Sequence, residues 1–169
     1  HHGLGLTGRT LGIVGLGKAC ELCMAEMDEQ HERLLALRTR LENTLESSMD
    51  VVQVNGHRDK RLPNITNISF GFVEGESLMM ALKEIAMSSG SACTSASLEP
   101  SYVLKALGVG DDLAHSSLRI SMGRWTTREQ IDYAGEKIIE AVHKLRALSP
   151  LYDLPNEGIA ITKIEWAAH

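Results

Sequence analysis

The sequence predicts an α+β fold in which a small sheet is covered by helices. Helical and strand patterns follow one another in the order helix, strand, strand, helix, helix, strand, helix, and this order implies a sheet with helices over it. The chain has 169 residues, of which 43% are hydrophobic and 23% charged, with a formal net charge of −5. These values suit one domain or a domain with an appended tail, and they exclude disorder as the main state.

The first helical pattern covers residues 13–48, and Gly15 and Gly17 are the positions where it could bend. Its apolar stripe recurs at threes and fours: Met24, Met27, Leu34, Leu37, Leu41 and Leu45. Cys20 and Cys23 form a CxxC motif inside this pattern. A redox pair or a zinc site is the functional alternative, but no second CxxC supplies further ligands, so we interpret both as buried small apolar side chains.

Two strand patterns, 51–54 and 65–73, follow the first helix. In the second, Ile68, Phe70 and Phe72 should point one way and Asn67, Ser69 and Gly71 the other. A third strand, 118–122, places Leu118, Ile120 and Met122 on one face and Arg119 and Ser121 on the opposite face. Short helices are predicted at 76–86 and at 102–107, the latter ended by Gly108. Thr126 or Thr127 should cap a last long helix that ends near Leu148.

Composition also narrows the class of protein. An acidic balance disfavours a dedicated nucleic-acid binder, and no apolar run approaches the roughly 20 residues that span a bilayer. Three cysteines do not form a disulfide framework, and no signal-peptide pattern is visible, so a reducing cytoplasm is expected. Residues 1–12 look like a tag or an altered leader. The run Gly3–Gly8 matches G-x-G-x-x-G, but no strand precedes it, which disfavours a nucleotide site.

Residues 88–101 differ from the rest of the chain, because they contain six serines, one threonine, and Cys93 in the middle. So little apolar area predicts a mobile surface loop. A cysteine in such a loop is exposed, and it is therefore available as a nucleophile, a metal ligand or a group carrier. The alternative is a surface cysteine without a role.

Three stretches resemble the cysteine desulfurase family, in its housekeeping iron–sulfur-cluster branch of class-V aminotransferase-like enzymes. They are Ser88-Ser-Gly-Ser-Ala-Cys93-Thr-Ser-Ala-Ser, Glu99-Pro-Ser-Tyr-Val-Leu, and Ala114-His-Ser-Ser-Leu-Arg119-Ile-Ser-Met-Gly-Arg124. The resemblance runs from about Ile13 to His169. It implies the C-terminal small domain of a fold-type I pyridoxal-phosphate enzyme at residues 13–150, with a docking tail at residues 151–169.

The family resemblance implies an enzyme that takes sulfur from L-cysteine, leaves L-alanine, and passes the sulfur to acceptor proteins. By this resemblance Cys93 is the nucleophile that becomes a persulfide, and it can help ligate a transient 2Fe-2S cluster shared with an iron–sulfur scaffold protein. Arg119 matches the arginine that binds the substrate carboxylate, a role its planar fork of donors suits. A surface ion pair is the alternative for Arg119. His115 lies in the matched motif without an assigned role, and the full-length form is expected to be a homodimer.

The match departs from the family pattern, because it covers only the C-terminal portion and lacks the large domain with the lysine that forms the cofactor's Schiff base, within Ser-x-His-Lys. In addition, Gly5-Leu6-Thr7-Gly8 stands where the family has Arg-Ser-Gly-Thr. His143-Lys144 is the only His-Lys pair, and its helical setting indicates solvated surface. The chain therefore looks like a truncated desulfurase that is catalytically silent alone. Two alternatives remain open: a sulfur-relay or docking module, and a metal-binding protein that uses Cys93 or the CxxC pair.

Overall fold

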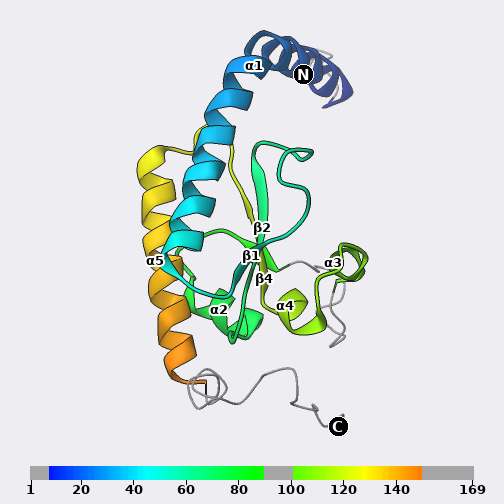
Figure 1. The fold of residues 1–169 in the computed structure, drawn as a ribbon. Helices are drawn as coiled ribbons and strands as arrows, with labels where there is room; N and C mark the ends of the chain where they lie inside the picture. Colours follow the sequence, from blue (N-terminus) through cyan, green and yellow to red (C-terminus); the bar gives the residue numbers. More distant parts are fainter. Residues whose placement is uncertain (1–7, 90–100, 150–169) are drawn as a thin grey trace, which may run out of the picture.

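The computed structural model describes residues 8–89 and 101–149, which form a four-stranded antiparallel sheet with two long helices over one face (Figure 1). The strands are β1 (Val52–Val54), β2 (Ile65–Phe70), β3 (Ser88–Ser89) and β4 (Ser117–Ser121), in the spatial order β1-β2-β4-β3. The long helices are α1 (Gly8–Ser48) and α5 (Arg128–Ala147). This arrangement confirms the predicted α+β class.

The core lies between the sheet and the two long helices. Val54, Ile68 and Leu118 form one row across β1, β2 and β4, because the register pairs Val54 with Ile68 and Ile68 with Leu118. All three side chains are buried. On the helix side the core is completed by Leu37, Leu41, Leu45, Ile131, Ile138 and Val142. The period-two prediction for β4 is confirmed, since Leu118 and Ile120 are buried whereas Arg119 and Ser121 are exposed.

Helix α5 begins where the sequence predicts. Thr127 is its N-cap: the Thr127 hydroxyl accepts a hydrogen bond from the Gln130 backbone N–H, and the Gln130 side chain accepts one from the Thr127 backbone N–H. This reciprocal capping box satisfies two backbone donors at the start of the helix. It selects Thr127 over Thr126 as the cap.

Three short helices connect the strands: α2 (Gly75–Ala81), α3 (Tyr102–Ala106) and α4 (Asp111–His115). Helix α3 ends before Gly108, whose φ of +79° is the left-handed conformation that glycine adopts without strain. Helix α2 starts closer to the end of α4 than a larger residue would permit, because a Cβ on Gly75 would lie 2.3 Å from the backbone oxygen of His115. The predicted helix 76–86 is thus shorter and starts one residue earlier.

Two further differences from the sequence prediction concern the strands. The predicted strand 65–73 ends at Phe70, because Phe72 has a φ of +62° that turns the chain away from the sheet, so Phe72 does not continue the buried face. Strand β3 and helix α4 were not predicted. Residues 1–7 of the expected leader 1–12, the loop around Cys93 (90–100) and the tail 151–169 lie outside the described residues, whereas residues 8–12 of that leader are the start of α1.

The burial predicted for Cys20 and Cys23 is wrong, since both are exposed. Helix α1 packs on the sheet and on α5 only through its second half, while its first half, dark blue in Figure 1, extends past the rest of the domain at an angle to the second half. Met24 and Met27 belong to the predicted apolar stripe but are exposed for the same reason. The periodicity predicted the helix correctly. It did not predict how much of the helix is covered by the rest of the domain.

A buried arginine near the end of α5 joins that helix to two other parts of the chain. Arg146 is 1% exposed. Its guanidinium donates to the backbone oxygens of Gly71 (3.0 Å), Asp50 (2.8 Å) and Val51 (3.3 Å), and to the Asp50 carboxylate (2.7 Å). Arg146 therefore holds the residues just before β1 and just after β2 against α5.

Candidate functional site

The face of the sheet opposite the long helices is polar, and it carries the predicted substrate-binding arginine. Strand register aligns one row across it: Asn67 on β2 is opposite Arg119 on β4, and Arg119 is opposite Ser88 on β3. Directly opposed residues of antiparallel strands point to the same face. The sheet therefore places an amide, a guanidinium and a hydroxyl side by side.

Arg119 differs in its surroundings from the structural arginines of the described chain. Its side chain is exposed, and no hydrogen bond or ion pair joins it to another residue in the described part of the chain. Three of the nine other arginines in the sequence provide a contrast, because Arg33, Arg38 and Arg146 each donate hydrogen bonds to backbone oxygens. The ion-pair alternative for Arg119 thus finds no partner among the described residues.

A buried amide network supports the polar face beside Arg119. Asn55, which is 5% exposed, donates from its side-chain nitrogen to the Asn67 amide oxygen (2.6 Å) and to the Ser69 hydroxyl (2.8 Å). Gln53 in turn donates to the Asn55 amide oxygen (3.1 Å). These bonds fix the Asn67 side chain next to Arg119. The sequence indicated polar Asn67 and Ser69 through their alternation, but no local pattern pointed to Asn55.

The segment that carries Cys93 leaves the sheet from the strand next to Arg119. Ser88 is paired with Arg119 and Ser89 with Leu118, and residue 90 begins the part of the chain that the structure does not describe. The chain is described again from Ser101, a buried residue that precedes α3. The expected nucleophile, Cys93, and its neighbours therefore lie outside the described residues. Strand β3, from which their segment begins, is described.

His115 ends α4 with an exposed side chain on the helix preceding β4. It lies near Glu74, the N-cap of α2. Partial burial of Glu74 acts to raise its pKa, but hydrogen bonds from the Ser77 hydroxyl and from the Ser77 and Glu76 backbone N–H groups outweigh burial and lower that pKa. His115 contributes a weaker attraction in the same direction. Nothing in this geometry assigns a catalytic role to His115.

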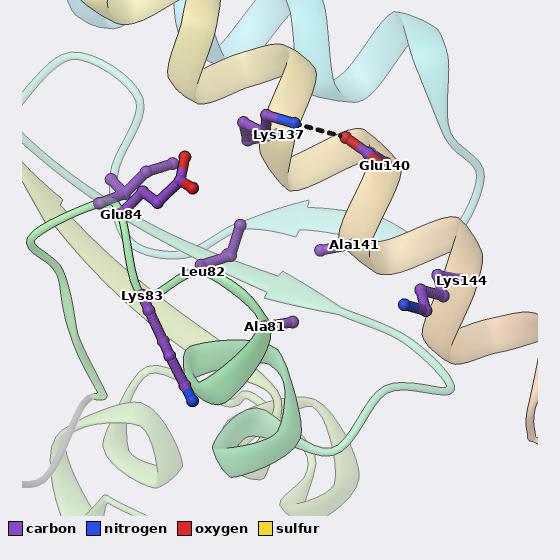
Figure 2. Close-up of a pocket in the computed structure, with 9 residues that line it drawn as sticks. Ala81, Leu82, Lys83, Glu84, Lys137, Glu140, Ala141 and Lys144 are labelled. Carbon is purple, nitrogen blue, oxygen red and sulfur yellow. Dashed lines mark hydrogen bonds and ion pairs between the residues drawn. The ribbon is translucent and has the colours of Figure 1, made fainter.

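A groove of about 340 Å³ lies on the helical side, between α5 and the residues that follow α2 (Figure 2). Its apolar part is formed by Leu82, Ile85 and alanines, and its charged side chains are Lys83, Glu84, Lys137, Glu140 and Lys144. Lys137 and Glu140 pair with each other at 2.9 Å. No residue of the polar sheet face lines the groove, so it is separate from the candidate site.

The described residues do not fit a pyridoxal-phosphate site. Such a site needs a lysine amine at the cofactor and an anion-binding pocket for the phosphate. No described strand contains a lysine, and His143 and Lys144 are exposed on α5, as the sequence predicts.

In the described ranges, no three His, Cys, Asp or Glu side chains are grouped as a metal site. No helix of the described chain is both long and apolar enough to cross a membrane.

Comparison with protein families agrees with this reading of the fold. The model of the family "Aminotransferase class-V" matches residues 5–134. Among curated proteins, the chain is 57% identical over 157 residues to a cysteine desulfurase IscS from Vibrio vulnificus (strain YJ016), and 56% identical over 157 residues to one from Pseudomonas putida (strain W619). Each alignment covers 93% of this chain and 39% of the relative. The chain thus spans about two fifths of the length of these relatives.

Two solved structures of NifS-like proteins have a similar fold over most of this chain. A NifS-like protein superposes with a TM-score of 0.69 at 27% identity, covering 85% of this chain and 38% of that protein. The NifS-like protein from Rickettsia africae ESF-5 superposes with a TM-score of 0.66 at 29% identity, covering 83% of this chain and 36% of the other.

Proposed function

We propose that this chain, which belongs to the class-V aminotransferase family, is the part of a cysteine desulfurase that carries its sulfur acceptor, Cys93, and its carboxylate-binding residue, Arg119. The proposed reaction takes sulfur from L-cysteine and leaves L-alanine. The high identity to relatives named cysteine desulfurase IscS supports the choice of substrate. We place this activity in the cytoplasm.

The pairing of β3 with β4 is the observation that carries the proposal. It holds Ser88 opposite Arg119, and Cys93 follows Ser89 by four residues. Four residues span at most about 14 Å, which limits how far the Cys93 backbone can be from the strand beside Arg119. The carboxylate and the sulfur of cysteine are only a few bonds apart, so the groups that bind them must be close. The sheet register is compatible with this requirement and supports the proposal.

Arg119 would bind the substrate carboxylate through two parallel N–H···O bonds, which fix the orientation of the amino acid. The Cys93 thiolate would then form an S–S bond with the substrate sulfur as the substrate C–S bond breaks. The electron pair of the C–S bond goes to carbon, which becomes the methyl group of alanine after it takes up a proton, and Cys93 keeps the sulfur as a persulfide.

Pyridoxal phosphate is the cofactor that the class-V family implies, and when bound it supplies electron withdrawal at the amino-acid carbons. Since the described residues do not form its site, the cofactor must be held elsewhere in the functional enzyme. We therefore expect this chain alone to give no sulfide from L-cysteine. A stable, stoichiometric cofactor complex that turns over L-cysteine would contradict this expectation.

The proposal is tested in a chimera in which this chain replaces the matching part of a complete relative. Cys93→Ser should abolish sulfide and alanine formation, whereas Cys20→Ser and Cys23→Ser, matched changes at exposed cysteines, should not. Arg119→Gln should raise KM for L-cysteine by roughly tenfold or more, the effect of losing a charged hydrogen bond. Turnover by the Cys93→Ser chimera would refute the proposed role of Cys93.

A sulfur-relay or docking module is the second candidate function, and the lack of lysine on the described strands favours it. In that function the chain receives sulfur from a complete desulfurase on Cys93 without binding the cofactor. Mass spectrometry after incubation with such an enzyme and L-cysteine should find one added sulfur atom on Cys93 and none on Cys20 or Cys23. Unmodified Cys93 would exclude the relay.

We also propose that the sulfur passes to an iron–sulfur scaffold protein and to other acceptor proteins. Cys93 would be a transient ligand of a 2Fe-2S cluster during this transfer, and residues 151–169 would bind the scaffold. Deletion of residues 156–169 from the chimera should weaken scaffold binding and leave cysteine turnover unchanged. Unchanged scaffold binding would remove the tail from the interface.

A further inference from the structure

The side-chain amide of Asn67 is held in one orientation by a buried neighbour. Asn55 donates from its side-chain nitrogen to the Asn67 amide oxygen (2.6 Å) and to the Ser69 hydroxyl (2.8 Å), and its own amide oxygen accepts from Gln53 (3.1 Å). The backbones are also joined, since the Asn55 N–H donates to the Asn67 backbone oxygen at 2.8 Å. Asn55 therefore engages the acceptor atom of the Asn67 side chain and leaves its donor atom on the other side.

The donor group of Asn67 lies next to a second unengaged donor. No described residue accepts a hydrogen bond from the Asn67 amide nitrogen, and this side chain is half-buried. Arg119 is directly opposite on β4, and directly opposed residues of antiparallel strands have Cβ atoms about 5 Å apart. A guanidinium has donors and no acceptor, so it cannot accept a bond from Asn67. The two strands thus present two side-chain donors without an acceptor to join them.

This pair of donors suits a carboxylate. An ionised carboxylate only accepts hydrogen bonds, and it accepts them on two oxygens. The positive charge of Arg119 strengthens its own bonds to such a ligand, and a neutral donor from a second strand adds another direction that fixes the plane of the carboxylate. An ammonium group, in contrast, would be repelled by Arg119 and would find no acceptor on Asn67.

We propose that Asn67 donates a hydrogen bond to the same carboxylate that Arg119 binds, and that Asn55 is the positioning residue that keeps the Asn67 nitrogen toward this ligand. The inference deepens the proposed function and rests on it for the identity of the ligand, which is the carboxylate of L-cysteine. It adds a substrate-binding residue on β2 to the one on β4.

Steady-state kinetics of the chimera test the role of Asn67. Asn67→Ala should raise KM for L-cysteine by roughly tenfold, the effect of one lost hydrogen bond to a charged group, with a much smaller change in kcat. Asn64→Ala is the matched control, because Asn64 is also half-buried but its side chain donates to the Met122 backbone oxygen (3.4 Å), outside this pair. An equal rise of KM in both variants would overturn the proposal.

Arg119→Gln in the same chimera separates this inference from the proposed function. A KM that is raised by Arg119→Gln but unchanged by Asn67→Ala would refute the role of Asn67 and leave the proposed function in place. A KM unchanged by Arg119→Gln would refute the proposed carboxylate site, and the inference with it.

A double-mutant comparison tests the positioning role of Asn55. Asn55→Asp keeps the size of the side chain but replaces its donor group with an acceptor, so the Asn67 amide should turn its nitrogen toward position 55 and its oxygen toward Arg119. KM should then rise about as much as in Asn67→Ala, and Asn55→Asp should add little in the Asn67→Ala background. An equal rise in both backgrounds would show that Asn55 acts only on the fold, which would overturn its positioning role.

Acetate binding to this chain alone tests the donor pair without turnover. The side-chain amide signal of Asn67, identified by its loss in Asn67→Ala, should shift in proton–nitrogen NMR spectra as sodium acetate replaces sodium chloride at constant ionic strength. Arg119→Gln should remove most of that shift, because both donors bind one carboxylate. An Asn67 signal that acetate leaves unchanged would overturn the proposal, and this readout does not depend on the proposed reaction.

Discussion

Replacing Arg146 with methionine should destabilise the folded chain more than any exposed substitution, although Arg146 is near the end of a helix. The side chain is 1% exposed, and methionine can occupy a similar volume without donating hydrogen bonds. The substitution therefore removes the bonds to the backbone oxygens of Gly71, Asp50 and Val51, together with the ion pair to the Asp50 carboxylate.

The magnitude follows from which oxygens lose their donor. Val51 O also accepts from the Gly71 N–H at 2.8 Å, so it keeps a partner. The bonds to Gly71 O (3.0 Å) and Asp50 O (2.8 Å) are then the main loss. At about 1.5 kcal/mol for each bond from a charged donor, Arg146→Met should cost roughly 3 kcal/mol. That is a large part of the 5–15 kcal/mol typical of a folded domain.

Urea denaturation followed by circular dichroism measures this loss, with Asp50→Asn as the matched control. The Asp50 side chain is 64% exposed, so its ion pair with Arg146 should contribute less than about 1 kcal/mol. We therefore expect a large effect of Arg146→Met and a small effect of Asp50→Asn. Equal effects would show that the ion pair dominates, and a neutral Arg146→Met would show that desolvation of the guanidinium cancels its bonds.

Three further predictions concern the helix starts. Gly75→Ala should lower the free energy of unfolding by roughly 2 kcal/mol, because its methyl group meets the His115 backbone oxygen at 2.3 Å, and a urea midpoint equal to that of the original chain would contradict this. Thr127→Ala should cost about 1 kcal/mol by the same assay, while Thr127→Ser, which keeps the hydroxyl, should restore most of it. The lowered pKa of Glu74 means that its stabilisation is complete above the unfolded-state pKa and is lost as pH falls through the folded-state value. Glu74→Gln should thus flatten the loss of stability below about pH 4.5, and an unchanged slope would remove Glu74 from the acid response.

Regular elements with local sequence signals were predictable. The Thr127 cap, the alternation through Arg119 and the glycine stop after α3 each depend on residues close in sequence, and all three are confirmed. Strand β3 and helix α4 were missed, because two and five residues are too few to show a period.

Burial depends on distant partners, and the sequence predicted it less well. Periodicity placed Cys20 and Cys23 on an apolar helix face, but it carries no information on where the sheet ends. Arg146 and Asn55 are buried polar residues whose partners are set by the fold, so no local sequence pattern indicates their burial. The roles of Cys93 and Arg119 stay predictions, since they come from the family resemblance.

Strand β3 has a consequence for dynamics. It is two residues long, is paired only with β4, and lies at the edge of the sheet. Edge segments with so few ladder bonds open by local unfolding at a small fraction of the global free energy, and their amides exchange with solvent while the central strands stay protected. The chain that leads to Cys93 can therefore detach from beside Arg119 without cost to the core formed by β1, β2 and β4.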